Sequence, residues 1–176
     1  MRVCLLFAVL CSFYSAFGQF RFEHLGVRDG LSQSSVNDIL QDREGFMWFA
    51  TQDGLNRYDG YDFSAYNKET QPSLAGNFTW SLVEDENGCI WLASQSGATR
   101  LDWKNGKSTR FYIDKANKVN SIYNQVSTIR IRKNEVFISF DGKGTYRILD
   151  TEFADSTEIE LSKSHIWHSQ HDTLRN

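Results

Sequence analysis

The sequence contains a single proline, three cysteines and no marked surplus of charge of either sign. Its 176 residues include 19 Lys and Arg against 22 Asp and Glu, a formal net charge of −3. Nucleic-acid-binding surfaces need a clustered basic excess, and the largest cluster here is the short run Arg130–Lys133, so we expect no nucleic-acid partner. Disorder is excluded as well, because 40 % of the residues are hydrophobic and 14 % are aromatic.

Long hydrophobic runs are absent except at the N-terminus. Arg2 precedes an apolar stretch over about residues 3–17, and small residues follow before Gln19, which is typical of a secretory signal peptide at 1–18 cleaved between Gly18 and Gln19. An uncleaved anchor is the rival hypothesis, but the stretch is shorter than the ~20 residues that span a bilayer. Lipid attachment at Cys11 is less favoured, because the residues before it, Ala8, Val9 and Leu10, lack the small residue expected directly before a lipidated cysteine. We therefore expect a periplasmic or extracellular protein without a membrane span after cleavage.

Removal of this leader leaves Cys89 as the only cysteine. A single cysteine cannot form an internal disulfide. The neighbours Gly88 and Ile90 indicate that Cys89 is buried and packs as a small hydrophobic residue.

Helical periodicity is also missing beyond a single turn, and short strand-like segments between turn residues take its place. They form three groups along the chain: 34–41, 46–51, 55–58 and 61–66; then 79–84, 89–94, 98–103 and 108–113; then 126–132, 135–140 and 144–150.

The first two groups share five identical residues, each of which recurs 43 positions later. A weaker third copy, from Asn134 to Asp150, has Phe137 in the place of the tryptophan and Gly144 in the place of the second glycine, after one inserted residue. Self-similarity at ~40–50 residues is the signature of propeller blades. The sequence therefore predicts an all-β fold, an incomplete β-propeller of about three and a half four-stranded antiparallel blades. The residues of the first copy and their counterparts are Asp42, Gly45, Trp48, Gly54 and Arg57, which recur as Asp85, Gly88, Trp91, Gly97 and Arg100.

The predicted organisation begins with the leader and a segment at 19–33 that reads as an N-terminal strand and linker, of the kind that completes the last blade of a ring. Because a closed propeller needs at least about four complete blades, we expect this chain to be a truncated product or the N-terminal piece of a longer propeller. The blades are expected at about 34–66, 77–113 and 125–160, with a partial blade at 164–176.

The pattern Asp-x-x-Gly-x-x-Trp-x-Ala-Thr-x-x-Gly-Leu-x-x-Tyr-Asp from Asp42 to Asp59, preceded by "GLSQSSVNDILQD", resembles the two-component regulator propeller repeat. The second copy departs from it at Ser94 and Ala98, and the third lacks the tryptophan. The resemblance covers roughly Phe20 to Asp150.

The resemblance implies a periplasmic β-propeller that forms the sensor portion of a bacterial hybrid two-component regulator. In that family the propeller usually has seven blades and is followed by a β-sandwich, a membrane helix and a histidine kinase, and many members are thought to sense oligosaccharides or other nutrients. No kinase module occurs in this chain, so the resemblance implies a non-enzymatic sensing segment. Its expected partners are an oligosaccharide ligand and the remaining blades of a longer parent chain.

Candidate ligand residues are few. Trp48 and Trp91 lie between apolar neighbours, which favours packing between blades over sugar stacking. Trp80, Tyr66 and Trp103 lie nearer strand ends or turns and are weak candidates for a ligand rim.

Metal and catalytic chemistry are not expected, and no cofactor is implied. His165, His168 and His171 form H-x-x-H-x-x-H, but strand geometry sends the middle histidine to the opposite face. Asp53, Asp59, Asp62 and Glu44 could be imagined as an acid/base pair for sugar hydrolysis. Hairpin Asp residues that recur once per blade are better explained as caps of local amides. A cell-surface scaffold propeller and, less favoured, a carbohydrate-active enzyme remain as alternatives.

Overall fold

The computed structural model describes residues 22–118, 121–133, 135–149 and 158–161. The predicted leader with its cleavage site at Gly18 and Gln19, the partial blade at 164–176 and the three histidines of that segment lie outside the described residues. Within them, the regular structure consists of twelve β-strands and two single 3-10 turns. The prediction of an all-β propeller fold is confirmed.

The first sheet is a four-stranded antiparallel meander. Its strands, in order from one edge to the other, are β1 (Val36–Gln41), β2 (Met47–Thr51), β3 (Gly54–Tyr58) and β4 (Phe63–Tyr66). These bounds agree with the segments expected from the sequence to within two residues.

The second sheet repeats the meander and adds a fifth strand. β5 (Thr79–Glu84), β6 (Ile90–Ser94), β7 (Gly97–Asp102) and β8 (Lys107–Tyr112) pair in order. The short strand β12 (Glu158–Glu160) then pairs with β8 in parallel.

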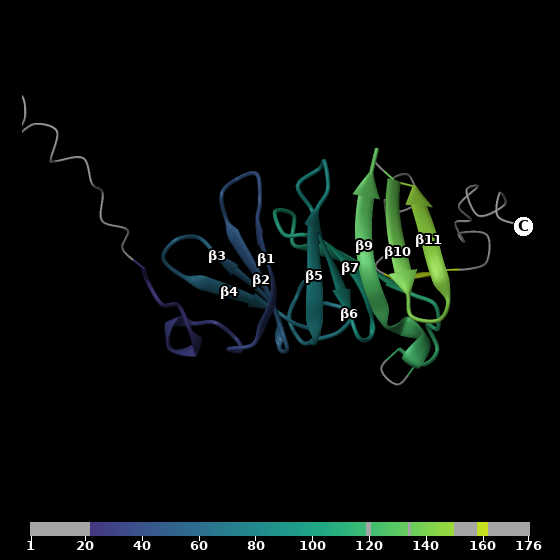
Figure 1. The fold of residues 1–176 in the computed structure, drawn as a ribbon, viewed down its shortest axis with the longest axis horizontal. Helices are drawn as coiled ribbons and strands as arrows, with labels where there is room; N and C mark the ends of the chain where they lie inside the picture. The colour runs from purple at the N-terminus through teal and green to yellow at the C-terminus, as the bar shows by residue number, and fades with distance from the viewer. Residues whose placement is uncertain (1–21, 119–120, 134, 150–157, 162–176) are drawn as a thin grey trace, which may run out of the picture.

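The third sheet has three described strands, β9 (Val126–Arg132), β10 (Glu135–Phe140) and β11 (Gly144–Leu149), in the order β11-β10-β9. Figure 1 shows the three sheets following one another along the long axis of the molecule, from β1–β4 through β5–β8 to β9–β11.

One part of the expected organisation differs in the structure. Residues 158–160, expected in the third blade, lie on the outer edge of the second sheet, where the backbone N–H of Leu161 donates to the carbonyl of Tyr112 at 2.7 Å. The expected N-terminal strand, at Phe20 to Phe22, lies almost wholly outside the described residues, so it stays a prediction; the linker that follows it contains a 3-10 turn at Val27–Asp29.

The three sheets share one register. Leu40, Trp48 and Arg57 lie side by side across the first sheet, as do Val83, Trp91 and Arg100 across the second. The third sheet aligns Arg130, Phe137 and Arg147 in the same way. We call the face that carries this row the forward face of each sheet, and the opposite one the rear face. Because side chains alternate along a strand, one shared register gives every sheet the same two faces.

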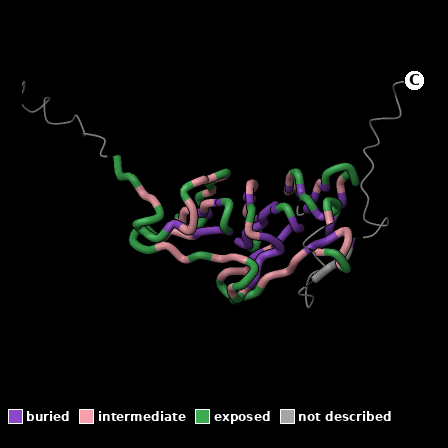
Figure 2. Tube along the Cα trace, turned by 90° about the horizontal axis from the view of Figure 1, so that it is seen from below, coloured by how far each residue is buried: buried purple, intermediate pink, exposed green. Residues whose placement is uncertain are grey.

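The core lies between sheets, where a forward face packs on a rear face. Trp48, Ala50 and Leu55 of the first forward face form one cluster with residues of the second rear face, including Ile90 and Leu92. A second cluster joins the second forward face to the third rear face; its members include Trp91, Ala93, Phe111, Ile129, Val136 and Ile138. Figure 2 shows the buried segments running through the middle of the molecule, with exposed segments at the turns. This sheet-on-sheet stacking is the architecture of propeller blades.

Polar contacts between hairpin turns fasten the first sheet to the second. The Arg43 guanidinium, in the β1–β2 turn, pairs with Glu84 at 2.7 Å and also donates to the carbonyls of Asp85 and Glu86 in the β5–β6 turn. Nearby, Lys104 pairs with Glu44. The Lys104 pKa is raised above its ordinary value, chiefly by the hydrogen bond that it donates to Glu44. All of these contacts cross from one sheet to the other.

Candidate functional site

The repeated aspartate and tryptophan form one hydrogen-bonded unit in each of the first two sheets. Asp42 accepts from the backbone N–H groups of Glu44 and Phe46 and from the Trp48 indole N–H at 2.8 Å. Asp85 repeats this arrangement, with the Trp91 indole N–H at 2.9 Å. One carboxylate therefore closes the turn and satisfies the indole donor that packing between sheets would otherwise bury unpaired.

The arginine of the repeat behaves differently in the two sheets. Arg100 donates from Nε to Asp85 at 3.0 Å, and both side chains are at least 85 % buried. Arg57, at the matching position, instead lies over the rings of Phe46 and Trp103, with its Cζ 4.8 and 4.6 Å from the two ring centroids. In the described part of the chain, its buried Nε has no hydrogen-bond partner. The guanidinium of the first sheet thus stabilises the inter-sheet contact by stacking on aromatic rings.

Two of the three ligand candidates belong to this inter-sheet core. Tyr66 lies 5.9 Å from Trp48 between ring centroids, and Trp103 lies 6.0 Å from it. Burial raises the Tyr66 pKa above its ordinary value. Both rings are half-buried around Trp48. The structure therefore gives Tyr66 and Trp103 a packing contact that sequence reasoning did not predict.

Trp80, the third candidate, sits at a β-bulge on β5. The pairing of β5 with β6 shifts register between Thr79 and Ser81, so Trp80 is the extra residue. Half-buried, it contacts Phe78 edge-on, with 5.6 Å between the ring centroids. Bulges re-aim a side chain out of the regular pleat and are common next to binding sites.

The same bulge occurs in all three sheets. In the first sheet the register shift falls at Asn37, whose side-chain N–H donates to the Thr79 carbonyl at 2.7 Å. In the third it falls at Ser127, whose hydroxyl donates to the Ser139 carbonyl. The polar bulge residues are held by backbone carbonyls, whereas Trp80 presents an aromatic ring. Sequence reasoning did not identify these bulges, because a bulge leaves the spacing of the repeat unchanged.

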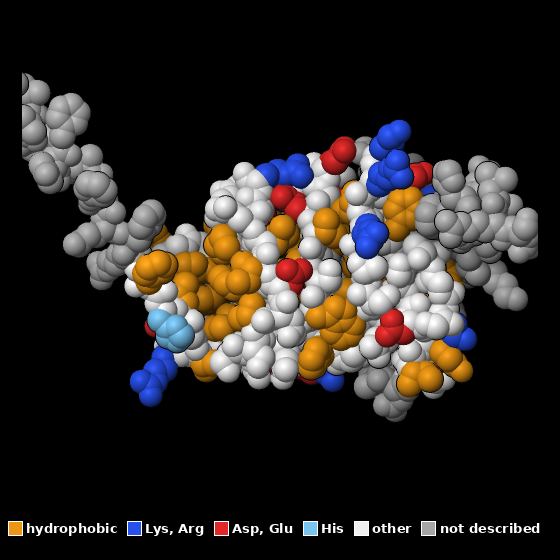
Figure 3. Space-filling model, in the orientation of Figure 1, with side chains coloured by type: hydrophobic (Ala, Val, Ile, Leu, Met, Phe, Trp, Pro, Cys, Tyr) orange, Lys and Arg blue, Asp and Glu red, His pale blue; other side chains and the backbone are white. Residues whose placement is uncertain are grey.

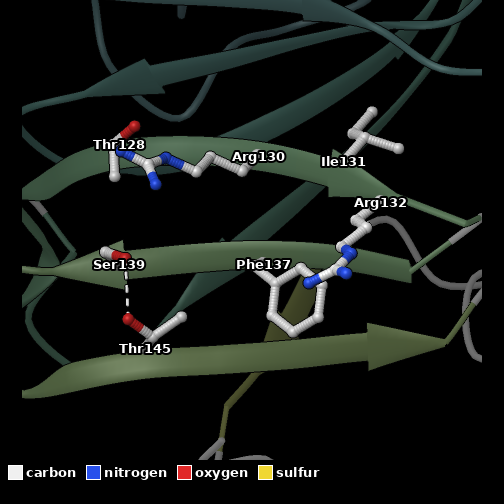
Figure 4. Close-up of a pocket in the computed structure, with 7 residues that line it drawn as sticks. All are labelled: Thr128, Arg130, Ile131, Arg132, Phe137, Ser139 and Thr145. Carbon is white, nitrogen blue, oxygen red and sulfur yellow. Dashed lines mark hydrogen bonds between the residues drawn. The ribbon is translucent and has the colours of Figure 1, made fainter. Parts of the chain in front are cut away.

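A hollow of about 540 Å³ opens on the forward face of the third sheet. Figure 4 shows its lining on β9, β10 and β11, with the Arg132 guanidinium beside the Phe137 ring and a hydrogen bond of 2.8 Å between the hydroxyls of Ser139 and Thr145. Sequence reasoning did not identify this site. The residues that line it are Thr128, Arg130, Ile131, Arg132, Phe137, Ser139 and Thr145.

The carboxylates considered for sugar hydrolysis do not gather into a pair. Asp59 accepts from the backbone N–H groups of Tyr61 and Asp62, and these hydrogen bonds hold its pKa below the ordinary value. Asp53 accepts from the Asn77 amide, and Glu44 pairs with Lys104. Among the described residues, no group of three or more His, Cys, Asp or Glu side chains could hold a metal ion. Cys89 is buried, as the sequence predicts.

The stacked four-stranded meanders, their shared register and their inter-sheet tryptophans define the described chain as a segment of a β-propeller. The family described as two component regulator propeller matches residues 30–53 and 73–96. Each matched range contains the first two strands of a sheet, β1 with β2 and β5 with β6. The chain carries repeats of the two-component regulator propeller family.

Known relatives agree with this assignment. Over 54 residues the chain is 48 % identical to a protein named Histidine kinase P4 from Formosa agariphila, a match that covers 31 % of this chain and 4 % of that protein. A solved structure described as the extracellular domain of a hybrid two component system from B. thetaiotaomicron has 28 % sequence identity and a TM-score of 0.63. It aligns with 73 % of this chain and 19 % of its own.

A second solved structure from B. thetaiotaomicron shows the same fold at lower identity. It is described as the extracellular domain of a one component system, with 17 % identity and a TM-score of 0.60, over 80 % of this chain and 20 % of that one. The chain thus spans about a fifth of the solved chains that it matches. Within the described residues, no helix is long and apolar enough to cross a membrane.

Proposed function

We propose that the chain is a non-enzymatic segment of an extracytoplasmic sensor propeller in a two-component system. The observation that carries the proposal is the match of two blades to the two component regulator propeller family. It is supported by the fold shared with the extracellular domain of a hybrid two component system. We further propose a periplasmic or extracellular location, export by residues 1–18, and further blades as partners of the first and third sheets, each of which has one face without a described sheet against it.

The proposed ligand is an oligosaccharide or a similar nutrient, with Trp80 as its stacking platform. Trp80 is half-buried, so part of its ring stays open to a ligand while the rest packs against Phe78 and the core between the second and third sheets. The bulge fixes its direction. Sensing follows if the ligand binds one arrangement of the sensor more tightly than the other, since only differential affinity shifts a conformational equilibrium.

Calorimetric titration of the chain with a panel of oligosaccharides tests the proposal. We expect one class to bind without release of new reducing ends. Trp80→Ala should weaken binding about tenfold, the loss of ~1.4 kcal/mol of stacking. Tyr123→Ala is the matched control, because Tyr123 is an aromatic residue 44 % exposed on a different loop. Hydrolysis products would establish an enzyme instead, and capture of a protein partner without any saccharide binding would favour the scaffold alternative.

A further inference from the structure

The linkers that lead from the first sheet to the second and from the second to the third are fastened in the same way. Asn77 and Asn124 each stand two residues before the next sheet begins, at β5 and β9. The side-chain oxygen of Asn77 accepts from the backbone N–H of Lys68, and that of Asn124 accepts from the backbone N–H of Ile113, both at 2.9 Å. One asparagine therefore sets the position of each linker against the sheet before it.

The first and second sheets also offer equivalent backbone carbonyls, those of Asn67 and Tyr112. The two are equivalent because the residue before each pairs with the residue that follows a repeated glycine. These pairs are Tyr66 with Leu55, after Gly54, and Phe111 with Ala98, after Gly97. In the first sheet, the carbonyl of Asn67 accepts from the N–H of Leu74 at 3.0 Å. The Leu74 side chain is 1 % exposed and belongs to the core between the first and second sheets.

In the second sheet, a residue from a distant part of the chain takes this place. The carbonyl of Tyr112 accepts from the N–H of Leu161 at 2.7 Å. Leu161 is 3 % exposed and belongs to the core cluster between the second and third sheets, as Leu74 belongs to the cluster one sheet earlier. Leu161 is therefore the structural counterpart of Leu74, although it is not part of the linker.

The linker has its own apolar residue, Ile122, which follows a serine as Leu74 does, but Ile122 is 75 % exposed. Figure 3 shows hydrophobic side chains on the surface at the lower end of the third sheet, where Figure 1 places the turn that contains it. Spacing explains the exposure. Leu74 stands three positions before Asn77, whereas Ile122 stands two before Asn124, and the residue three positions before Asn124 is the polar Ser121.

We propose that residues 158–161 act as a detachable clasp, which closes the core between the second and third sheets and opens while the rest of the described fold stays intact. The clasp is attached by three residue pairs of β12 with β8 and by the N–H and side chain of Leu161. Leu74 is held more firmly, because the next residue, Ala75, donates its N–H to Thr99 at 2.8 Å and Asn77 fastens the same linker. A short segment at a sheet edge opens at a lower free energy than the core strands.

Opening of the clasp changes the core beside Trp80. Trp80 and Ile113 are half-buried and pack against the cluster that contains Leu161. Departure of Leu161 removes an apolar side chain from this cluster and so alters the surroundings of Trp80. The clasp is a property of the fold, and it does not depend on the sensing function proposed above.

Amide hydrogen exchange tests the clasp within one molecule, because Leu74 and Leu161 donate to equivalent carbonyls. We expect a protection factor for Leu161 that is at least about tenfold below that of Leu74 and at least about tenfold above that of an unstructured chain. Equal protection of the two amides would show that the clasp does not detach. No protection of Leu161 would show that it does not close.

The indole N–H resonances give a second test. Leu161→Ala should shift the resonance of Trp80 and leave that of Trp48, which belongs to the core between the first and second sheets. Ile122→Ala is the matched control and should shift neither, because Ile122 is exposed. An unchanged Trp80 resonance in Leu161→Ala would contradict the place of the clasp in this core.

A restored linker tests the spacing argument. One glycine inserted between Tyr123 and Asn124 gives the second linker the spacing and the Gly-Asn sequence of the first. We expect Ile122 then to displace Leu161, so that the Leu161 amide loses its protection and Ile122→Ala, neutral in the wild type, now lowers the unfolding midpoint. A glycine inserted beside Gly106, in the open turn between β7 and β8, is the control and should leave Leu161 protected.

Continued protection of Leu161 in the chain with the restored linker would overturn the proposal that the two segments compete for one place. Should that chain lose the wild-type β-sheet circular dichroism, the wild-type protection factors of Leu74 and Leu161 decide.

Discussion

At the scale of single residues, the repeat is held by carboxylates that receive several donors at once. Asp42 and Asp85 each accept two backbone N–H groups and one indole N–H. Only Asp85 also pairs with an arginine, at a site where both side chains are at least 85 % buried. The two aspartates therefore differ by one buried ion pair in otherwise equal surroundings.

This difference predicts unequal costs for the same substitution. Asp85→Asn leaves Arg100 as a buried charge without its counter-ion, which costs about 3–5 kcal/mol of unfolding free energy. Asp42→Asn weakens hydrogen bonds whose donors are all neutral N–H groups and leaves no cation unpaired, at about 1–3 kcal/mol. Urea unfolding at one fixed protein concentration should rank the variants in this order, and equal midpoints would contradict the role given to Arg100.

Gly54 and Gly45 form a second matched pair. Both have positive φ, +96° and +94°, but a methyl group added at Gly54 would overlap the backbone oxygen of Tyr66, whereas nothing lies near Gly45. Gly45→Ala should cost about 1–2 kcal/mol for the backbone conformation alone. Gly54→Ala adds a steric overlap of about 1–3 kcal/mol or more, and should lower the unfolding midpoint further. If the unfolding midpoint of Gly54→Ala lies at or above that of Gly45→Ala, the backbone of β4 does not approach Gly54 closely.

At the scale of elements, the third sheet shows how the repeat changes as a unit. Asp42 directly follows β1 and Asp85 directly follows β5. Arg132, the last residue of β9, occupies the same register position in the third sheet. In the same sheet Phe137, whose side chain has no N–H donor, replaces the tryptophan. Arg147 Nη1 lies 3.5 Å from Glu135 Oε1, whereas Arg100 in the second sheet pairs with the turn aspartate Asp85. The loss of the acceptor and the loss of the donor occur together, so neither leaves a buried polar group unpaired.

A double-mutant cycle tests this coupling. Phe137→Trp alone adds an indole N–H donor that has no acceptor. Arg132→Asp alone adds a carboxylate at the turn that has no indole N–H to accept from. The double variant rebuilds the hydrogen bond of the other two sheets and should be more stable than the sum of the single effects by about 1–3 kcal/mol. Additive single effects, measured by denaturant unfolding, would mean that Arg132 does not occupy the aspartate position.

The elements themselves could be predicted from the sequence to a large extent. The bounds of β5, β9 and β10 match the expected segments, because apolar residues recur within each strand and polar turn residues separate the strands. The burial of Trp48 and Trp91 between sheets also follows from their apolar neighbours. Repetition supplied the strongest signal, since it identifies equivalent positions without knowledge of the fold.

Other features depend on tertiary contacts that leave no local signal. β12 is three residues long and gains its place only by pairing with β8. The bulge at Trp80 changes pairing without changing chain spacing. The hollow on the third sheet arises from side chains of three strands. The third repeat is spaced differently from the first two, so the sequence alone did not show that Arg132 is equivalent to the two aspartates. The candidate site was therefore predicted only in part, through Trp80.

At the scale of the whole molecule, the core of the described chain depends on separate sheets that stack face to face. The two buried clusters join consecutive sheets. The repeat match and the fold comparison both refer to this arrangement.

The most direct test is the nuclear Overhauser spectrum of the isotopically labelled chain. Trp48 lies in the first sheet and Trp103 directly after β7 of the second, with ring centroids 6.0 Å apart. The account predicts cross-peaks between the indole protons of Trp48 and those of Trp103, together with no backbone cross-strand peaks between β4 and β5. Backbone cross-strand peaks that join the two tryptophan-bearing segments within one continuous sheet would contradict it.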